Sequence, residues 1–286
     1  MNKYIASLRL RTLPLSMSGI ILGSGLAYDY RLSTIDWYVF AWAILTTLSL
    51  QILSNLSNEL GDAQKGTDSD QHGRAAYGMQ AGTITAPQMK AMIGVFIFLS
   101  ILFGTSLIYC AFGSLIGVKS LLFILLGLLA IIGAMTYTLG RHSYGYMGLG
   151  DLGVFVFFGL VSTLGSFYLQ TQFMSWETIY CGIAIGLPCV GVLNLNNIRD
   201  MNNDRAHGKR TFASLLGITG SKIYHTCLLI ACLALFAFWG HLWVLVVAPI
   251  WVWHIGYVWT HEGSALDLQM PVLMLSTFAV GCLGWV

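Results

Sequence analysis

The sequence predicts an all-α, polytopic membrane protein, and three observations support this fold class. Of the 286 residues, 56% are hydrophobic and only 9% are charged, whereas a soluble domain carries about 25% charged residues. Apolar runs near 20 residues long, enough to cross a bilayer as a helix, recur along the chain. The breaks between these runs hold nearly all of the charge. The net charge of +2 is too small to indicate nucleic-acid binding.

Nine apolar runs predict nine transmembrane helices, which we expect to form one integral-membrane domain over residues 1–286. The first run lacks a small-residue cleavage site after it, which favours a retained helix over a secretory signal. All six cysteines lie in apolar runs without a CxxC pair, so we expect free thiols that pack as small hydrophobes. The runs cover residues 13–29, 37–58, 88–112, 120–139, 150–169, 178–198, 222–240, 242–260 and 269–286.

The basic residues predict the orientation of these helices. Alternating helices place the N-terminus and every second loop on one side of the membrane. Of the 14 Lys and Arg residues, only Arg31 and Lys119 fall on the other side. Because cytoplasmic loops carry the excess of Lys and Arg, we expect a cytoplasmic N-terminus and an external C-terminus. The loops on the N-terminal side lie near residues 60–87, 140–149, 199–221 and 261–268.

Two polar clusters at the ends of apolar runs are candidates for a chemical centre. In the first cluster (residues 58–68), Asn58 and Asp62 are four residues apart. In the second (residues 196–204), Asn196, Asp200 and Asp204 repeat that spacing, which places side chains on one face of a helix. A carboxylate at full membrane depth costs about 2.5–3.5 kcal/mol, so these acids need compensation. Their oxygens suit Mg²⁺, which commonly bridges a few carboxylates to substrate phosphates.

Basic and aromatic residues accompany the clusters. Acids that hold Mg²⁺ beside Lys and Arg match the needs of a diphosphate leaving group, whose charge grows as the carbon–oxygen bond breaks. The ring faces of Tyr137, Tyr144 and Tyr146 are able to stabilise an allylic cation. Each of these assignments has an alternative. The basic residues also suit topogenic charge, and the aromatic residues suit packing at the membrane interface. For Glu59 alone, a solvated helix end is the favoured interpretation. The neighbouring bases are Lys65, Arg199, Arg205, Lys209 and Arg210.

Both clusters resemble the aspartate-rich motifs of the UbiA superfamily of intramembrane prenyltransferases. The first match is Asn-Glu-Leu-Gly-Asp at residues 58–62, with Asp68. The second is Asp-Met-Asn-Asn-Asp-Arg at residues 200–205, with Gly-Lys-Arg-Thr at 208–211. The chain departs from the family pattern at Glu59, where the superfamily usually has Asp.

Three further stretches resemble the branch of this superfamily that prenylates 1,4-dihydroxy-2-naphthoate. They are Arg-Thr-Leu-Pro at residues 11–14, Gly-Met-Gln at 78–80 and Tyr-Gly-Tyr-Met-Gly-Leu-Gly-Asp at 144–151. Tyr77 stands where an Arg usually precedes the Gly-Met-Gln stretch, and Arg74 is the candidate substitute.

The resemblance implies nine transmembrane helices around a central cavity, in the bacterial cytoplasmic (inner) membrane, with the site facing the cytoplasm. It implies transfer of a polyprenyl group from polyprenyl diphosphate to 1,4-dihydroxy-2-naphthoate, with loss of carbon dioxide and diphosphate. The product would be demethylmenaquinol, a step of menaquinone biosynthesis, and the cofactor Mg²⁺. Arg11 would bind the naphthoate carboxylate, and Asp151 would deprotonate or orient a hydroxyl group.

The resemblance assigns the site residues in three groups, each named by its position in this sequence. The implied Mg²⁺ ligands are Asn58, Asp62, Asp68, Asp200 and Asp204. The implied catalytic residues are Asp62, Asp200, Asp204, Lys209 and Asp151. The implied substrate-binding residues are Arg11, Asn58, Asn196, Asn197, Arg74, Lys65, Tyr137 and Tyr146.

Two alternatives stay open at this stage. Intramembrane carboxylates near helix breaks also mark the ion pathways of cation-coupled transporters. A transporter would place them near the bilayer midplane, whereas both clusters here run into basic loops. Within the enzyme class, other aromatic acceptors compete, such as 4-hydroxybenzoate, homogentisate, haem and chlorophyllide.

Overall fold

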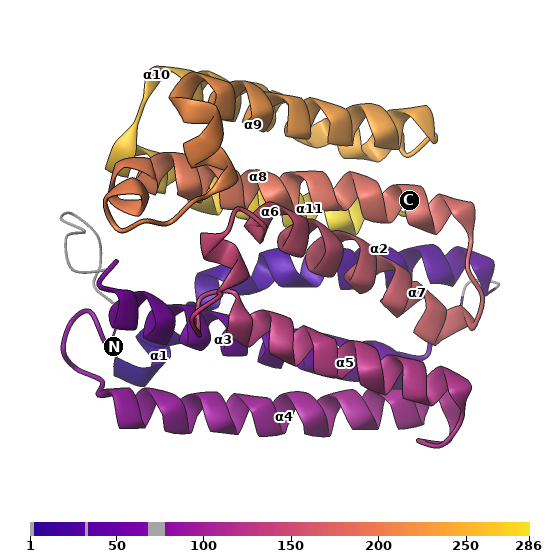
Figure 1. Cartoon of the computed structure of the whole chain (residues 1–286). Helices are drawn as coiled ribbons and strands as arrows, with labels where there is room; N and C mark the ends of the chain where they lie inside the picture. Colours follow the sequence, from indigo (N-terminus) through magenta and orange to yellow (C-terminus); the bar gives the residue numbers. More distant parts are fainter. Residues whose placement is uncertain (1–2, 32–33, 68–77) are drawn as a thin grey trace. The chain divides into compact units, whose positions relative to one another are not determined.

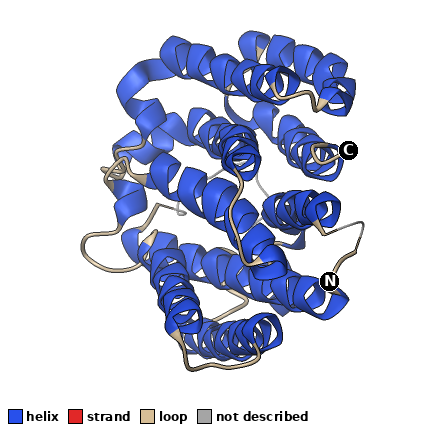
Figure 2. Ribbon diagram, turned by 90° about the vertical axis from the view of Figure 1, so that its right-hand side faces the viewer, coloured by secondary structure: helices blue, strands red, loops and turns tan. Residues whose placement is uncertain are grey.

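The computed structural model describes residues 3–31, 34–67 and 78–286, and they are almost entirely helical (Figure 2). Within these ranges there is no β-strand, and the one isolated bridge pairs Met147 with Arg210. Nine helices in this part of the chain are long and apolar enough to cross a membrane. The predicted class, an all-α protein with nine transmembrane helices, is confirmed, and the central cavity stays a prediction.

The elements follow one another along the chain as Figure 1 labels them, with short 3-10 segments and one π-helical segment, η3, between the α-helices. Their bounds are α1 (Lys3–Ser7), η1 (Leu10–Thr12), α2 (Leu13–Tyr30), α3 (Trp37–Lys65), α4 (Ala86–Phe112), α5 (Val118–Thr136), η2 (Tyr144–Tyr146), α6 (Gly150–Val154), η3 (Phe155–Val161), α7 (Ser162–Thr171), α8 (Trp176–Ala206), α9 (Phe212–Phe238), η4 (Leu242–Val247), α10 (Ala248–Thr260), η5 (Gly263–Leu268) and α11 (Gln269–Leu283).

The helices that carry the polar clusters extend beyond the predicted apolar runs. α3 continues to Lys65 and α8 to Ala206, whereas the runs end at residues 58 and 198. Hydropathy falls where the polar residues begin, but Glu, Gln, Lys and Ala keep a high helix propensity. Asn58 and Asp62 of the first cluster and residues 196–204 of the second are therefore helical, as their spacing of four residues predicted. α9 also begins earlier than predicted, and it kinks at Gly217, where φ is 72°.

The chain divides into two compact units. Unit 1 comprises Met1–Leu13, Trp42–Gly150 and Asn202–Thr211. Unit 2 comprises Pro14–Ala41, Asp151–Met201 and Phe212–Val286. The expectation of one integral-membrane domain stays a prediction.

In unit 1, α4 and α5 lie side by side, and α4 packs against α3 (Figure 1). One face of α3 supplies Leu53, Leu56 and Leu60 to a buried core, at the spacing of a helix face. α4 begins at a capping box, in which Thr85 and Gln88 satisfy backbone N–H groups of the first turn.

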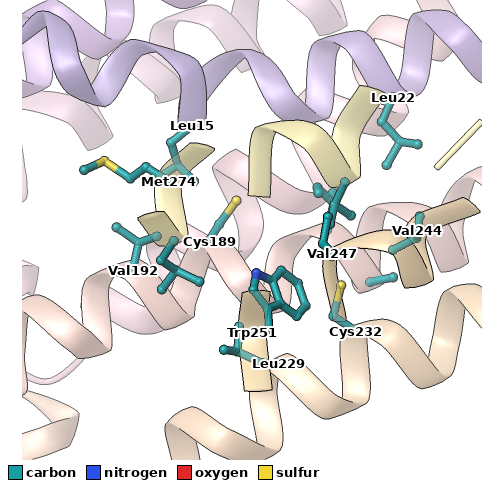
Figure 3. Close-up of a cluster of buried hydrophobic side chains, with 14 of the residues drawn as sticks. Leu15, Leu22, Cys189, Val192, Leu229, Cys232, Val244, Val247, Trp251 and Met274 are labelled. Atoms are coloured by element: carbon teal, nitrogen blue, oxygen red, sulfur yellow. The ribbon is translucent and has the colours of Figure 1, made fainter. Parts of the chain in front are cut away.

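In unit 2, a second apolar core surrounds Trp251 of α10 (Figure 3). The Trp251 indole is 1% exposed and donates a hydrogen bond to Ser276 Oγ at 2.7 Å. η3 approaches α8 closely, since a Cβ on Gly159 would lie 2.7 Å from the Cα of Gly186. Small residues allow such close approach of helices in membranes.

All six cysteines of the chain are free thiols, as predicted.

Candidate active site

The end of α3 is closed by a Schellman motif that fixes the geometry of the first cluster. Gly66 adopts a φ of 74° and donates its N–H to Ala63 O at 3.4 Å. Thr67 donates its N–H to Asp62 O at 3.1 Å. This pair of bonds satisfies carbonyls that a helix end leaves open, and it requires a left-handed residue that glycine supplies without strain. As a result, Thr67 folds back beside Asp62.

The end of α8 repeats this motif in the second cluster. Gly208 has a φ of 70° and donates its N–H to Arg205 O at 3.2 Å. Lys209 donates its N–H to Asp204 O at 2.8 Å. The Lys209 ammonium also lies 3.3 Å from the Asp204 carboxylate, whose side chain is 2% exposed. Both clusters therefore place an aspartate in the last turn and a polar residue of the following loop beside it.

Within unit 1, Tyr146 contacts the end of α3 through its side chain and the segment after α8 through its backbone carbonyl. Its hydroxyl donates to Asp62 Oδ1 at 2.8 Å and lies 2.6 Å from Thr67 Oγ1. Asn203, on the last turns of α8, donates its Nδ2 to Thr67 O at 2.8 Å. The N–H of Arg210 donates to Tyr146 O at 3.2 Å. Residues distant in sequence thus converge on one tyrosine.

Two ammonium groups lie near the same aromatic ring. Lys65 Nζ is 3.7 Å from the centroid of the Tyr146 ring, and Lys209 Nζ is 5.5 Å from it. Lys65 also donates to Thr138 O at 2.8 Å and to Ser143 Oγ. A cation over a tyrosine face is attracted by the ring quadrupole. The ring that was predicted to face substrate is therefore in contact with a lysine in this structure.

The environment keeps the Tyr146 phenol protonated. Burial raises the pKa of Tyr146 above its ordinary value, and the charge of Asp62 raises this pKa further. Burial also raises the pKa of the neighbouring Tyr144 to about 12. At neutral pH, Tyr146 is consequently a hydrogen-bond donor to the Asp62 carboxylate.

Asn58 is held by the segment after α5. Thr138 Oγ1 donates to Asn58 Oδ1 at 3.1 Å and to Ser57 O at 3.0 Å. A Cβ on Gly61 would lie 2.6 Å from Thr138 Oγ1 and 2.8 Å from its carbonyl carbon. The glycine inside the first motif is therefore required by the close contact between α3 and Thr138.

The favoured interpretation of Glu59 as a solvated helix end is wrong. Its side chain is 0% exposed. Glu59 Oε1 accepts the N–H of Met79 at 2.7 Å and the hydroxyl of Ser7 at 3.2 Å. α1 and the Gly-Met-Gln stretch at residues 78–80 cover this face of α3, which hydropathy could not show. Glu59 ties both of these segments to the helix that carries Asp62.

In unit 2, the second cluster has an arginine at its centre. The Arg199 guanidinium donates Nε to Asp200 Oδ1 at 2.9 Å and Nη2 to Asp200 Oδ2 at 2.7 Å. Its Nη2 also donates to Asn196 Oδ1, and its Nη1 donates to Asp267 Oδ1 at 2.5 Å. Asp267 belongs to η5, far from the second cluster in sequence.

The remaining predicted residues occupy the following positions. Arg11 is exposed on η1. Tyr137 makes an edge-to-face contact with Tyr144, with ring centroids 5.3 Å apart. Asp151 lies in the first turn of α6 and is hydrogen-bonded by Tyr224 of α9. Asn197 is 3% exposed on α8. Two further predicted residues, Asp68 and Arg74, lie outside the described residues.

Several contacting residues were not predicted from the sequence. Thr67 lies in the first cluster and Asn203 in the second, and these positions were a usable signal. The others belong to segments that only folding brings near, so no spacing rule identifies them. They are Thr138, Ser143, Tyr224 and Asp267.

The donors fit Mg²⁺ better than a softer metal. They are carboxylate and amide oxygens, the ligands of hard cations. In the part of the chain that the structure describes, no three His, Cys, Asp or Glu side chains form a metal-binding group. Mg²⁺ typically binds through one or two carboxylates and completes its shell with substrate phosphates and water. Asp62 Oδ1 accepts the Tyr146 hydroxyl, so a metal at Asp62 would bind a carboxylate that Tyr146 orients.

Comparison with known proteins gives consistent results. The model of the UbiA prenyltransferase family matches residues 17–275. The 1,4-dihydroxy-2-naphthoate octaprenyltransferase of Escherichia coli K12 is 42% identical over 264 residues, which cover 89% of this chain and 84% of the relative. The Haemophilus influenzae protein of the same name is 38% identical over 262 residues, with the same coverage of 89% and 84%.

Solved structures agree on the fold. The apo structure of a UbiA homologue from Aeropyrum pernix K1 has a TM-score of 0.68 at 16% identity and covers 95% of this chain and 98% of its own. A UbiA homologue from Archaeoglobus fulgidus, bound to DMAPP and Mg²⁺, has a TM-score of 0.65 at 14% identity and covers 98% and 99%. Because the family model spans most of the sequence and a relative is 42% identical over most of its length, the chain belongs to the UbiA prenyltransferase family.

Proposed function

We propose that this chain transfers a polyprenyl group from polyprenyl diphosphate to 1,4-dihydroxy-2-naphthoate, with release of diphosphate and carbon dioxide. The product is demethylmenaquinol, a precursor of menaquinone. Family membership and the names of the bacterial relatives support this acceptor. The geometric observation that supports it best is the junction at Tyr146, where the helix ends bearing Asp62 and Asp204 meet two lysines within unit 1.

Oxygen donors from both clusters are the proposed ligands of Mg²⁺. The Archaeoglobus homologue of similar fold was solved with Mg²⁺ and DMAPP, which supports a metal shared with a prenyl diphosphate. When bound, Mg²⁺ supplies neutralisation of the negative charge that develops on the departing diphosphate. The proposed ligands are Asn58, Asp62, Asp68, Asp200 and Asp204.

Cationic side chains of the chain bind the diphosphate. In this structure the Lys65 and Lys209 ammonium groups lie against the Tyr146 ring. Diphosphate oxygens carry negative charge, so they would attract these ammonium groups more strongly than the quadrupole of a ring face does. The Tyr146 hydroxyl keeps the Asp62 carboxylate in one orientation. Rings such as Tyr137 and Tyr146 stabilise the allylic cation that forms.

The acceptor is recognised by its carboxylate and its hydroxyl groups. Arg11 binds the carboxylate through its forked N–H donors. Asp151, held by Tyr224, orients or deprotonates a hydroxyl group. The ring carbon that bears the carboxylate forms the new carbon–carbon bond with the prenyl cation. The bond from that carbon to the carboxylate then breaks, and its electron pair returns to the ring as carbon dioxide leaves.

The proposed location is the cytoplasmic (inner) membrane of a bacterium, with the N-terminus and the active site facing the cytoplasm. The nine apolar helices make the chain a multi-pass membrane protein. The excess of Lys and Arg on one side supports this orientation.

Substrate labelled in its carboxyl group tests the proposal. Membranes containing the protein are incubated with Mg²⁺, a polyprenyl diphosphate and carboxyl-labelled 1,4-dihydroxy-2-naphthoate. We expect one labelled carbon dioxide for each prenyl chain transferred, and an unlabelled product. Asp62→Asn, in membranes where the protein accumulates normally, should lose at least about 10²-fold in rate, as expected when stabilisation of transition-state charge is removed. A prenylated product that keeps the label, or transfer to 4-hydroxybenzoate alone, would reject this acceptor.

A further inference from the structure

The buried Arg199 guanidinium of unit 2 is shared between two carboxylates. Its side chain is 3% exposed, and it forms a forked pair with Asp200, whose side chain is 15% exposed. Its third nitrogen pairs with Asp267, whose side chain is 33% exposed. Adjacent residues of a helix do not face each other, so the Arg199 side chain must fold over to reach Asp200. Asn196 and Asp267 hold it in that conformation.

The charge of this group depends on Asp267. With both carboxylates ionised, Arg199, Asp200 and Asp267 together carry one negative charge. Without Asp267, the forked pair of Arg199 and Asp200 would be neutral. A neutral pair attracts a divalent cation far less than a pair with a surplus negative charge. Asp267 is therefore the source of the surplus negative charge among these three residues.

The same loop region contains a second acid that pairs with a buried cation. Glu262 lies 3.3 Å from the Lys222 ammonium, and Lys222 also donates to the carbonyls of Trp259 and His261 at the end of α10. This pair stabilises a helix end, and its cation, Lys222, lies outside the second cluster in sequence. Glu262 is thus a matched control for the loss of one negative charge from this region.

We propose that Asp267 is a positioning residue for the divalent cation. It orients Arg199 and leaves the Arg199–Asp200 pair with the negative charge that binding of the cation needs. The inference rests on the proposed function, since Asp200 is there a ligand of Mg²⁺. The contact that places Asp267 in this role is the 2.5 Å hydrogen bond from Arg199 Nη1 to Asp267 Oδ1.

Manganese binding provides a test that does not depend on turnover. The full chain is purified in lipid nanodiscs with a non-ionising prenyl diphosphate analogue, and free Mn²⁺ is followed by electron paramagnetic resonance. Loss of an outer partner of a metal ligand typically costs 10- to 100-fold in metal affinity, so Asp267→Asn should raise the Kd for Mn²⁺ by about 10-fold or more. Asp267→Glu keeps the charge and should restore most of the affinity. Glu262→Gln should bind Mn²⁺ like the wild type.

Activity measurements separate this role from a purely structural one. Asp267→Asn should raise the Mg²⁺ concentration for half-maximal prenyl transfer and keep most of the rate at saturating Mg²⁺. Wild-type Mn²⁺ affinity in Asp267→Asn, or an equal loss in Glu262→Gln, would overturn the inference and leave the proposed function intact. A wild-type protein that binds no Mn²⁺ with the analogue would overturn both.

Discussion

The hydroxyl group of Tyr146 has more consequence for the candidate site than its residue type suggests. An aromatic residue near a membrane surface commonly packs or anchors at the interface. Here the phenol instead donates a hydrogen bond to Asp62 and contacts Thr67, while the Lys65 ammonium lies over the face of its ring. One side chain thus sets the position of an acid, a base and a loop.

Removal of that hydroxyl should reduce catalysis without unfolding the protein. Tyr146→Phe keeps the ring beneath Lys65 and deletes the bond to Asp62. A hydrogen bond to a charged group contributes about 1.5–3 kcal/mol, so kcat/KM for the prenyl diphosphate should fall roughly 10- to 100-fold. Tyr144→Phe is the control, because that hydroxyl donates to Gly133 O instead. Equal activity of the two variants would show that the Asp62 contact has no catalytic value.

Glu59 should matter as an acceptor rather than as a charge. Glu59→Gln keeps an oxygen for the Met79 N–H and should retain most activity. Glu59→Ala leaves that buried N–H unsatisfied, which costs about 1–3 kcal/mol, and should lower both the melting temperature and the rate. Thermal denaturation in detergent and initial rates measure the two effects. If Glu59→Gln failed as severely as Glu59→Ala, the negative charge itself would be required.

At the scale of elements, the two cluster-bearing helices end in the same way. α3 and α8 each close with a Schellman motif whose left-handed residue is Gly66 or Gly208. The motif brings the residue after the glycine back onto the aspartate of the last turn. Glycine adopts the left-handed conformation of this cap without strain, because it has no Cβ.

Alanine at either cap should strain the backbone next to the site. The left-handed conformation costs a residue with a Cβ about 1–2 kcal/mol, so Gly208→Ala should lower the melting temperature and raise KM for the prenyl diphosphate through displacement of Lys209. Gly94→Ala, within α4, is the control, since its Cβ would meet nothing within 4 Å. That substitution should be neutral or slightly stabilising. A Gly208→Ala protein as stable and active as Gly94→Ala would contradict the capping role.

At the scale of the whole molecule, composition and charge decide more than any single contact. A chain with 56% hydrophobic and 9% charged residues has too few polar residues to cover its apolar surface in water. Nine of its described helices are long and apolar enough to cross a bilayer. Each compact unit nevertheless has its own buried core, around Leu56 in unit 1 and Trp251 in unit 2.

The orientation of the whole chain can be tested with reporter fusions. The charge distribution predicts that the turn after α4 lies outside and the segment after α5 lies in the cytoplasm. A phosphatase that is active only outside the cytoplasm should be active when fused after Ser114 and inactive when fused after His142. A cytoplasmic reporter should give the reverse pattern. Activity of the phosphatase at His142 would invert the proposed topology and move the site to the other face.

Local properties of the sequence determined much of this protein. Hydropathy located nine spans, and a spacing of four residues placed the polar clusters on helices. Helix boundaries were less accurate, because hydropathy ends where charges begin while helix propensity continues. α3 and α8 therefore reach Lys65 and Ala206, beyond the apolar runs.

Only the tertiary structure decided which polar groups meet. The burial of Glu59 by α1, the convergence of Asp62 and Asn203 near Tyr146, and the sharing of Arg199 with Asp267 join residues far apart in sequence. Periodicity reports which face of a helix a residue occupies, but it carries no information about the segment that packs against that face. The sequence predicted the chemical class of the site, whereas the fold decided which partners orient its charges.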